Sequence, residues 1–189
     1  ELQPGEVTDL HWSNLGLSIV RGLGDRGESY DIWISPDNAP SLWDALVRVG
    51  AKPVGYEALE LDRMVRGIPK YGVDMTERFL PQETAQDRAL HFAKGCYLGQ
   101  EIVERIRSRA QLHRVLTGFE IEGAPPSAGT SVTAGDKKVG EITSAAEVPV
   151  EGGKKTIALG YIRIEANTSG NKVRVEEAGA VVSALPFQI

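Results

Sequence analysis

The chain has 189 residues, of which 41% are hydrophobic and 25% are charged, so it can bury a core and does not have the composition of a disordered chain. Its 21 Lys and Arg residues against 26 Asp and Glu residues leave a net charge of -5, which argues against a protein whose whole surface binds nucleic acid or an anionic membrane. A lone cysteine, Cys96, excludes an intrachain disulfide and a zinc knuckle of the C-x-x-C type.

Targeting and metal signals are absent from the sequence. No apolar run approaches the ~20 residues of a membrane span and no signal peptide opens the chain, so we expect a soluble, cytoplasmic protein without a membrane partner. The histidines His11, His91 and His113 show no metal-ligand spacing, so no metal site is expected. The chain begins with Glu1 rather than methionine, as a trimmed expression product would, or as the C-terminal part of a longer polypeptide would.

The first segment of the chain predicts a hairpin followed by a helix. Leu15 to Val20 is rich in β-favouring residues, 22–27 is a glycine-rich turn, and Tyr30 to Ile34 alternates as a half-buried strand does. Asp37 or Asn38 then serves as the N-cap of a helix. The apolar stripe of this helix consists of Leu42, Trp43, Leu46 and Val47.

Three more helices and a loop are predicted before the texture of the sequence changes. Gly50 ends the first helix, Tyr56 to Arg66 forms the second, and Tyr71 to Pro81 is an ordered loop. A third helical stretch covers about Glu83 to Phe92, and a fourth runs from Tyr97 to about Arg109. The residues expected on the buried face of the fourth helix are Ile102, Val103 and Ile106.

From Leu112 onward, short alternating runs rich in glycine, valine and threonine are separated by turn signals. Five or six strands at such spacing predict a small antiparallel barrel or sandwich. The chain therefore divides into an α+β domain over 1–111 and an all-β domain over 112–189. The predicted strands are Val115 to Ile121, Thr130 to Ala134, Val139 to Thr143, Thr156 to Ile164, Lys172 to Glu176 and Val181 to Leu185.

The segment from Lys94 to Glu101 carries the chemistry. It places the only thiol, that of Cys96, between a lysine and the predicted start of a helix. Both the ammonium group and the unpaired N–H groups of a helix start favour thiolate over thiol. We therefore predict a reactive Cys96 with Lys94 as its activating neighbour.

The residues around the thiol admit two interpretations. Gly95 and Gly99 allow the backbone to approach a ligand closely, and the side chains of Gln100 and Glu101 can satisfy backbone donors in the first helical turn. Alternatively, Cys96 is a small buried hydrophobic residue, as free cysteines mostly are, and the two glycines form a packing groove.

The octapeptide 94–101, which includes Tyr97, and the following Arg105 resemble the signature of the YgfZ family of folate-binding proteins. That family is related to the T-protein (aminomethyltransferase) of glycine cleavage. The resemblance covers essentially the whole chain in order. Further matching runs are Asp62 to Asp74, Leu80 to Glu83, Val139 to Ser144 and Ala158 to Arg163.

The resemblance implies a ferredoxin-like α+β part of a folate-binding domain followed by a C-terminal antiparallel β-barrel. It also implies binding of tetrahydrofolate or a one-carbon-loaded derivative, in a protein that supports assembly or repair of iron–sulfur clusters. Its partners would be iron–sulfur client or assembly proteins, and Cys96 would be essential. The alternatives are an aminomethyltransferase acting on a lipoyl-carried aminomethyl group, a branch that lacks this cysteine, and a scaffold module that binds no folate.

The resemblance also suggests folate-contacting residues. Asp31 lies nearest the position of the acid that recognises the pterin, with Glu28 as competitor, and a carboxylate can accept from the amidine-like edge of a pterin in bidentate fashion. Arg63 and Tyr71 match the pair that contacts the anionic and aromatic tail. Their alternative interpretations are a surface helix charge for Arg63 and a core ring for Tyr71. The family is longer, with an N-terminal region that completes the folate pocket.

The basic stretch from Arg105 to Arg114 is the only candidate for a nucleic-acid patch. We interpret it instead as a solvated helix face or as the partner of nearby acidic residues, so no nucleic-acid partner is expected. A polyglutamylated folate tail or an acidic protein surface would use the same charges.

Overall fold

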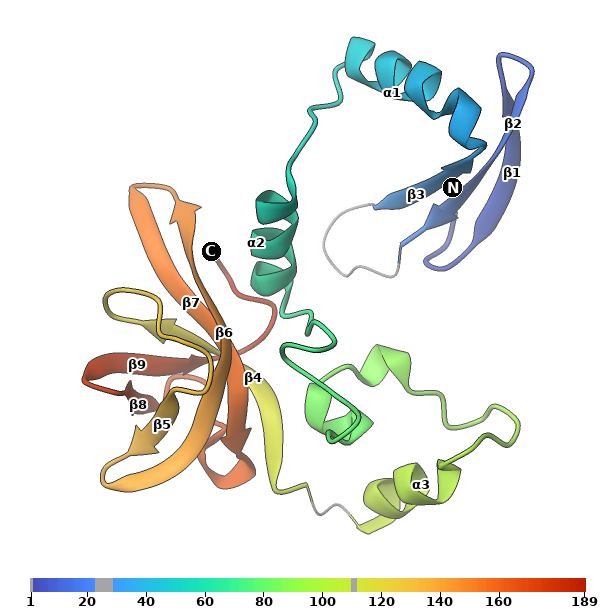
Figure 1. Ribbon diagram of the computed structural model, residues 1–189. Coiled ribbons are helices and arrows are strands. Elements are labelled where there is room, and N and C mark those ends of the chain that lie inside the picture. Colours follow the sequence, from blue (N-terminus) through green and yellow to red (C-terminus); the bar gives the residue numbers. More distant parts are fainter. Residues whose placement is uncertain (1, 23–28, 110–111) are drawn as a thin grey trace. The chain divides into compact units, whose positions relative to one another are not determined.

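The computed structural model describes residues 2–22, 29–109 and 112–189 of the chain. The described chain forms two compact units, Glu1–Gly55 and Tyr56–Ile189 (Figure 1). The described residues 56–109 therefore cluster with the barrel. The domain boundary between 111 and 112, which concerns independent folding, stays a prediction.

The first unit is a three-stranded antiparallel sheet in the order β1-β2-β3, followed by a helix. The strands are β1 (Val7–Trp12), β2 (Leu15–Arg21) and β3 (Tyr30–Ile34), and the helix is α1 (Ala39–Arg48). The predicted hairpin strands and helix are thus confirmed, and β1 is an addition. Ser13 and Asn14, which both have positive φ, form the tight turn into β2, as two-residue hairpin turns require.

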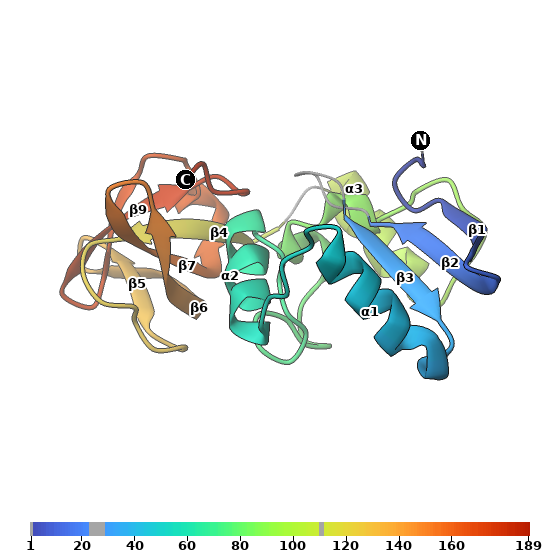
Figure 2. The ribbon, with the colours of Figure 1, turned by 90° about the horizontal axis from the view of Figure 1, so that it is seen from above.

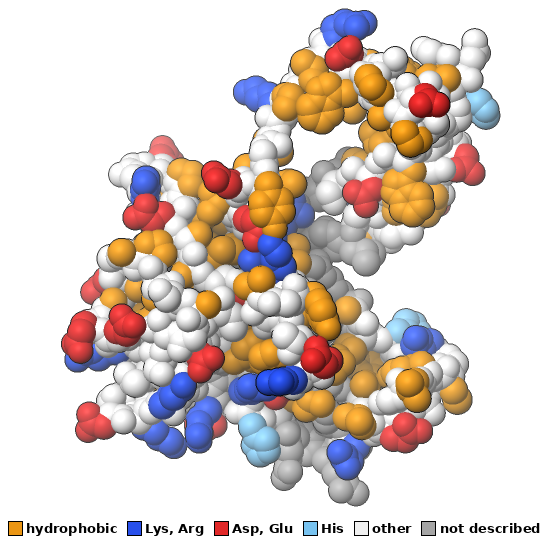
Figure 3. Space-filling model, in the orientation of Figure 1, with side chains coloured by type: hydrophobic (Ala, Val, Ile, Leu, Met, Phe, Trp, Pro, Cys, Tyr) orange, Lys and Arg blue, Asp and Glu red, His pale blue; other side chains and the backbone are white. Residues whose placement is uncertain are grey.

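The apolar side chains of the first unit lie largely at its surface. Leu17 is its only buried large hydrophobic residue among those described. Trp33 is 67% exposed and Trp43, on the predicted inner stripe of α1, is 57% exposed. Figure 3 shows the hydrophobic side chains over the sheet and α1 of this unit. The described part of the unit therefore has almost no core of its own.

The second unit begins with α2 (Tyr56–Arg66), as predicted, which ends at Gly67 with φ +70. The predicted helix over 83–92 is wrong, because this segment forms only two short 3-10 turns, at Pro81–Thr84 and Asp87–Ala89. Ala85 between them has φ +54, a left-handed conformation that interrupts any continuous helix.

The last helix, α3, spans Gln100–Arg109 and so begins later than predicted. Gly99 has φ +89, which a right-handed helix cannot include, and its carbonyl accepts from the N–H groups of Ile102 and Val103 at 3.1 and 3.4 Å. The helix therefore starts after Gly99 rather than at Tyr97. Val103 is buried as predicted, whereas Ile102 is 47% exposed. The Ile106 side chain lies outside the described part of the structure.

The C-terminal part is a closed antiparallel barrel in the order β4-β7-β6-β5-β8-β9 (Figure 2). This confirms the predicted α+β organisation with a C-terminal barrel. Strand β6 is longer than predicted because its hairpin pairing with β7 extends from Gly140 opposite Ile162 to Val150 opposite Gly153. The strands are β4 (Arg114–Ile121), β5 (Ser131–Ala134), β6 (Lys137–Val150), β7 (Gly153–Arg163), β8 (Lys172–Val175) and β9 (Ala178–Ser183).

The barrel has an interior core and an apolar outer face. A second buried cluster joins α2 to the outer face, and the C-terminal segment closes it: the N–H of Phe187 donates to the carbonyl of Val65 at 2.9 Å. Gly118 makes room for this ring, since a Cβ there would lie 2.6 Å from Phe187 Cζ. The buried members of the cluster are Met64, Leu116, Val148, Ile157, Leu159, Tyr161 and Phe187. None of the described helices is both long and apolar enough for a membrane crossing.

Candidate functional site

The thiol of Cys96 is exposed, in the loop that precedes α3. Because α3 begins only at Gln100, the thiol does not sit directly at a helix start, and that part of the sequence interpretation is corrected. The packing interpretation is also wrong, since Cys96 is not buried and a Cβ at Gly95 or Gly99 would have no atom within 4 Å. Gly99 is required by its positive φ, and the loop holds an accessible thiol.

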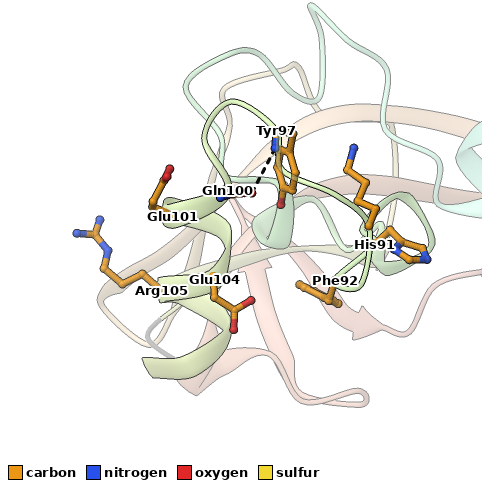
Figure 4. Close-up of a pocket in the computed structure, with 8 residues that line it drawn as sticks. His91, Phe92, Tyr97, Gln100, Glu101, Glu104 and Arg105 are labelled. Carbon is orange, nitrogen blue, oxygen red and sulfur yellow. Dashed lines mark hydrogen bonds between the residues drawn. The ribbon is translucent and has the colours of Figure 1, made fainter.

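A cavity of about 560 Å³ lies between this loop and the first two turns of α3 (Figure 4). The Gln100 Oε1 atom accepts from the N–H of Tyr97 at 3.2 Å, and the Lys94 ammonium lies 4.5 Å from the centre of the Tyr97 ring. The cavity is lined by His91, Phe92, Lys94, Tyr97, Gln100, Glu101, Glu104 and Arg105.

The predicted motif residues are thus largely brought together. Lys94, Tyr97, Gln100, Glu101 and Arg105 all line the cavity, which offers two cations, an aromatic ring and acceptors within one hollow. His91 and Phe92 complete the wall from the loop side (Figure 4). Sequence reasoning missed these two, because they precede the octapeptide. The one feature of the sequence that could have identified them is that they lie two and three residues before Lys94.

Arg63 belongs to a network within the second unit. Its Nη1 atom lies 2.7 Å from Oδ2 of Asp74, and its Nε atom donates to Glu60 at 3.0 Å. Asp74 is fully buried and also accepts from the hydroxyls of Thr143 and Ser144, each at 2.6 Å. Arg63 is therefore not a free surface charge, and its guanidinium already has protein partners. It neutralises a buried carboxylate that ties the segment after α2 to β6.

Tyr71 and the acidic candidates lie elsewhere. Tyr71 is 67% exposed and its hydroxyl donates to Glu77 at 3.2 Å, so its interpretation as a core ring is wrong. Asp31 is an exposed residue of β3, paired in register with Val20, in the first unit. Glu28 lies outside the described residues. The assignment of these residues to folate stays a prediction.

Among the residues that the structure describes, no three His, Cys, Asp or Glu side chains gather so as to hold a metal ion.

Comparison with known proteins agrees with this architecture. Residues 114–188 match the family model of the glycine cleavage T-protein C-terminal barrel domain. The barrel of this chain is similar to the barrel domain of glycine cleavage T-proteins. A crystal structure of the glycine cleavage system aminomethyltransferase T from Bartonella henselae superposes with a TM-score of 0.77 at 21% identity, covering 91% of this chain and 50% of that one. This likeness concerns the fold.

Two relatives show the similarity in sequence. The chain is 33% identical over 183 residues to a putative chloroplastic transferase of Arabidopsis thaliana, covering 94% of this chain and 41% of the relative. It is 34% identical over 177 residues to an aminomethyltransferase of Rubrobacter xylanophilus, covering 91% of this chain and 46% of the relative. The chain thus spans about half the length of the relatives it matches.

Proposed function

We propose that this chain acts as part of a folate-dependent one-carbon transferase of the aminomethyltransferase type. The observation that carries the proposal is similarity along both units, since proteins named aminomethyltransferase match 91% and 96% of the chain. The barrel family and the fold point the same way. The earlier expectation of an iron–sulfur role has no support from these relatives and becomes the second candidate.

The cavity between the Cys96 loop and α3, which we call the α3 cavity, fits the tail of tetrahydrofolate. Its volume of about 560 Å³ lies within the range of small-molecule sites, roughly 300–1,000 Å³. The tail consists of an aromatic ring followed by carboxylates. Tyr97 and Phe92 supply aromatic surface, and Lys94 and Arg105 supply cations for the carboxylates, beside the Glu101 and Glu104 side chains that line the same cavity. The Gln100 side chain fixes the backbone of Tyr97 and so the position of its ring.

In this proposal the chain's residues bind and orient, and the bound folate supplies the acceptor for the one-carbon unit. The donor would be a lipoyl-carried aminomethyl group. The Lys94 and Arg105 charges hold the tail. Arg63 supports the site indirectly, by keeping Asp74 neutralised between α2 and β6.

Calorimetric titration of the full-length protein with tetrahydrofolate tests the proposal. A Lys94→Gln, Arg105→Gln pair should weaken binding by about tenfold or more, because one charged hydrogen bond contributes about 1.5–3 kcal/mol. Lys154→Gln with Lys155→Gln, on the barrel, removes the same charge and should leave affinity unchanged. Absence of tetrahydrofolate binding would refute the proposal. Binding without one-carbon transfer from a lipoyl-carried donor would refute the transferase part alone.

The exposed thiol favours one second candidate, a tetrahydrofolate-binding protein that supports iron–sulfur clusters in client enzymes. Cys96 is accessible, and no resolving cysteine exists in the chain, so any disulfide or cluster ligation would involve a partner or a small thiol. For this function, Cys96→Ser should preserve folate binding and abolish support of iron–sulfur enzymes in cells. Full support by the variant would exclude it.

A further inference from the structure

A second cavity, of about 320 Å³, lies on the outer face of the barrel and shares no lining residue with the α3 cavity. Its walls come from the loop before the 3-10 turn at Pro81–Thr84 and from three neighbouring strands. Phe79 belongs to the loop, Arg114 to β4, Lys138 to β6, and Tyr161 and Arg163 to β7. We call it the barrel cleft.

Two stacked rings form the aromatic wall of the barrel cleft. The ring centres of Phe79 and Tyr161 lie 4.4 Å apart at an interplanar angle of 21°. The Arg114 guanidinium carbon lies 4.6 Å from the centre of the Phe79 ring and 5.3 Å from that of Tyr161. At these distances a cation is attracted to the ring faces. The wall therefore holds the guanidinium in place, and Phe79, which is only part-buried, supplies its accessible apolar surface.

The guanidinium of Arg114 is also fixed through one of its edges. Its Nε and Nη2 atoms lie 3.1 and 3.2 Å from the two carboxylate oxygens of Glu83, which is buried and also accepts from the N–H of Leu80 at 3.1 Å. A guanidinium has five N–H donors in a planar fork. The edge formed by Nη1 and Nη2 is thus held in a set direction, and no described group accepts from Nη1.

Two further cations line the barrel cleft. Lys138 pairs with Glu141 at 3.0 Å, and Arg163 pairs with Glu165 at 3.7 Å. All four side chains are at least half exposed, and exposed pairs of this kind hold their partners weakly. The charged side chains of the lining are three cations, Arg114, Lys138 and Arg163, and one carboxylate, Glu141, and the two exposed pairs can open toward an anion.

The Tyr161 hydroxyl is an unsatisfied polar group in this wall. Tyr161 is 4% exposed, and its hydroxyl has no hydrogen-bond partner among the described residues. Buried polar groups without a partner are uncommon and call for an explanation. A tyrosine hydroxyl keeps its proton at neutral pH and can donate it in a hydrogen bond, and burial, with a further contribution from the Glu83 carboxylate, raises the pKa of Tyr161 further.

We propose that the barrel cleft binds a small aromatic carboxylate. The carboxylate would accept from the free edge of Arg114 in bidentate fashion, with Lys138 and Arg163 adding charge, and the ring would lie against the Phe79–Tyr161 wall. The half-buried ring of Phe79 favours a ligand with a hydrophobic body over a bare inorganic anion. The inference does not depend on folate binding, because it uses none of the residues of the α3 cavity.

NMR titration of the full chain with benzoate tests the proposal. We expect saturable shifts of the amides of 138–141 and 161–163 and of the Arg114 Nε signal. The pair Lys138→Gln, Arg163→Gln should weaken benzoate binding at least threefold, and the charge-matched pair Lys154→Gln, Lys155→Gln should not change it. Arg114→Lys keeps the charge but loses the planar fork, and should weaken binding at least fivefold. If Arg114→Lys fails to fold, the Lys138, Arg163 pair decides.

Inorganic phosphate at the same concentrations separates the ligand classes. The proposal requires benzoate to bind more tightly than phosphate. Equal binding would mean a plain anion site and would overturn the assignment to aromatic carboxylates. Shifts that do not saturate, or that are the same in the Lys138, Arg163 pair as in the unmodified chain, would overturn the site itself. Tetrahydrofolate binding that is weakened in the Lys94, Arg105 pair and unchanged in the Lys138, Arg163 pair reads out the α3 cavity, so failure of either site is visible alone.

Discussion

Arg63 Nη1 and Asp74 Oδ2 are 2.7 Å apart, with the arginine side chain 15% exposed and the carboxylate fully buried. A buried carboxylate is stable only when its charge is paired and its oxygens are hydrogen-bonded. Asp74 meets both conditions, because Thr143 and Ser144 donate to its other oxygen at 2.6 Å. One ion pair therefore joins α2, the following loop and strand β6.

Removing one partner of this pair should destabilise the second unit strongly. Arg63→Ala leaves the Asp74 charge buried and unpaired, so we expect a loss of about 3–5 kcal/mol in the free energy of unfolding, measured in urea. The matched control is Arg66→Ala. Its partner Asp62 is 54% exposed, so the loss should stay below about 1 kcal/mol. Equal effects of the two variants would mean that the Asp74 network adds no more to the free energy of unfolding than an exposed ion pair does.

The network also changes how a folate result on Arg63 should be interpreted. A direct contact would make Arg63→Ala lose tetrahydrofolate affinity while keeping stability. The geometry predicts the opposite order, with stability lost first. Affinity measured on Arg63→Lys, which keeps the charge, separates the two effects: unchanged unfolding with weaker binding would restore Arg63 as a ligand contact.

A second prediction concerns the glycine that starts α3. Gly99 has φ +89 and Gly95 does not have positive φ, although neither has an atom within 4 Å of an added Cβ. Gly99→Ala should therefore cost about 1–2 kcal/mol through backbone strain alone. Gly95→Ala, free of that strain, should cost much less. Thermal unfolding followed by circular dichroism gives both values, and an equal loss in the two variants would contradict the strained helix start.

A third prediction follows from the exposure of Cys96. Because the thiol is accessible in the folded chain, its alkylation rate with iodoacetamide at fixed pH should lie within a few-fold of the rate in urea. Cys96→Ser should change stability by no more than about 0.5 kcal/mol, as for other surface substitutions. Protection of the thiol by a hundredfold or more in the folded state would show that the loop covers it.

A fourth prediction concerns the barrel as an independent unit. Residues 112–189 contain every strand of the closed barrel and its interior core, so an excised fragment should fold and show dispersed amide signals. It should be less stable than a 56–189 fragment, because Met64 of α2 belongs to the same buried cluster as Leu116 and Leu159 of the barrel. A collapsed spectrum for 112–189 would place the folding boundary at Tyr56 instead.

The barrel strands and the elements β2, β3, α1 and α2 could be predicted from the sequence, because the signals that define them are local. Turns such as Gly152-Gly153 separate runs whose side chains alternate, and these runs became β4 to β9. The helix over 83–92 was predicted wrongly because Ala85 adopts a left-handed conformation. Alanine rarely adopts this conformation, and no neighbouring residue in the sequence indicates it. Helix propensity there was overridden by the tertiary contact of Glu83 with Arg114.

The site was predictable only in part, for a related reason. The cavity residues Lys94 to Arg105 are neighbours in the chain, so one motif identifies most of them. The partners of Asp74 lie far along the chain, at Thr143 and Ser144 of β6. Their proximity depends on how α2 packs against the barrel, which no local pattern encodes. The barrel cleft has the same origin, since its rings come from a loop and from β7.

The last prediction uses the alkaline limb of the stability curve. Burial raises the pKa of Tyr161 above its ordinary value of 10.0. Below about pH 10 the hydroxyl is protonated in both the folded and the unfolded chain, and it adds no pH dependence. Above that pH the unfolded chain loses the proton first, which favours unfolding. The Tyr161 contribution therefore makes stability fall as pH rises, by at most about 1.4 kcal/mol per pH unit.

Tyr161→Phe should remove this contribution. At pH 7 the variant should be as stable as the unmodified chain or more stable, because the lost hydroxyl has no partner among the described residues. Between pH 10 and 11.5 its free energy of unfolding should fall less steeply than that of the unmodified chain, whose other tyrosines and lysines titrate equally in both proteins. Tyr71→Phe, at an exposed position, is the control and should keep the original slope. Parallel stability curves for the unmodified chain and Tyr161→Phe would mean that the Tyr161 hydroxyl is solvated or hydrogen-bonded in solution, which would also remove one support of the barrel cleft.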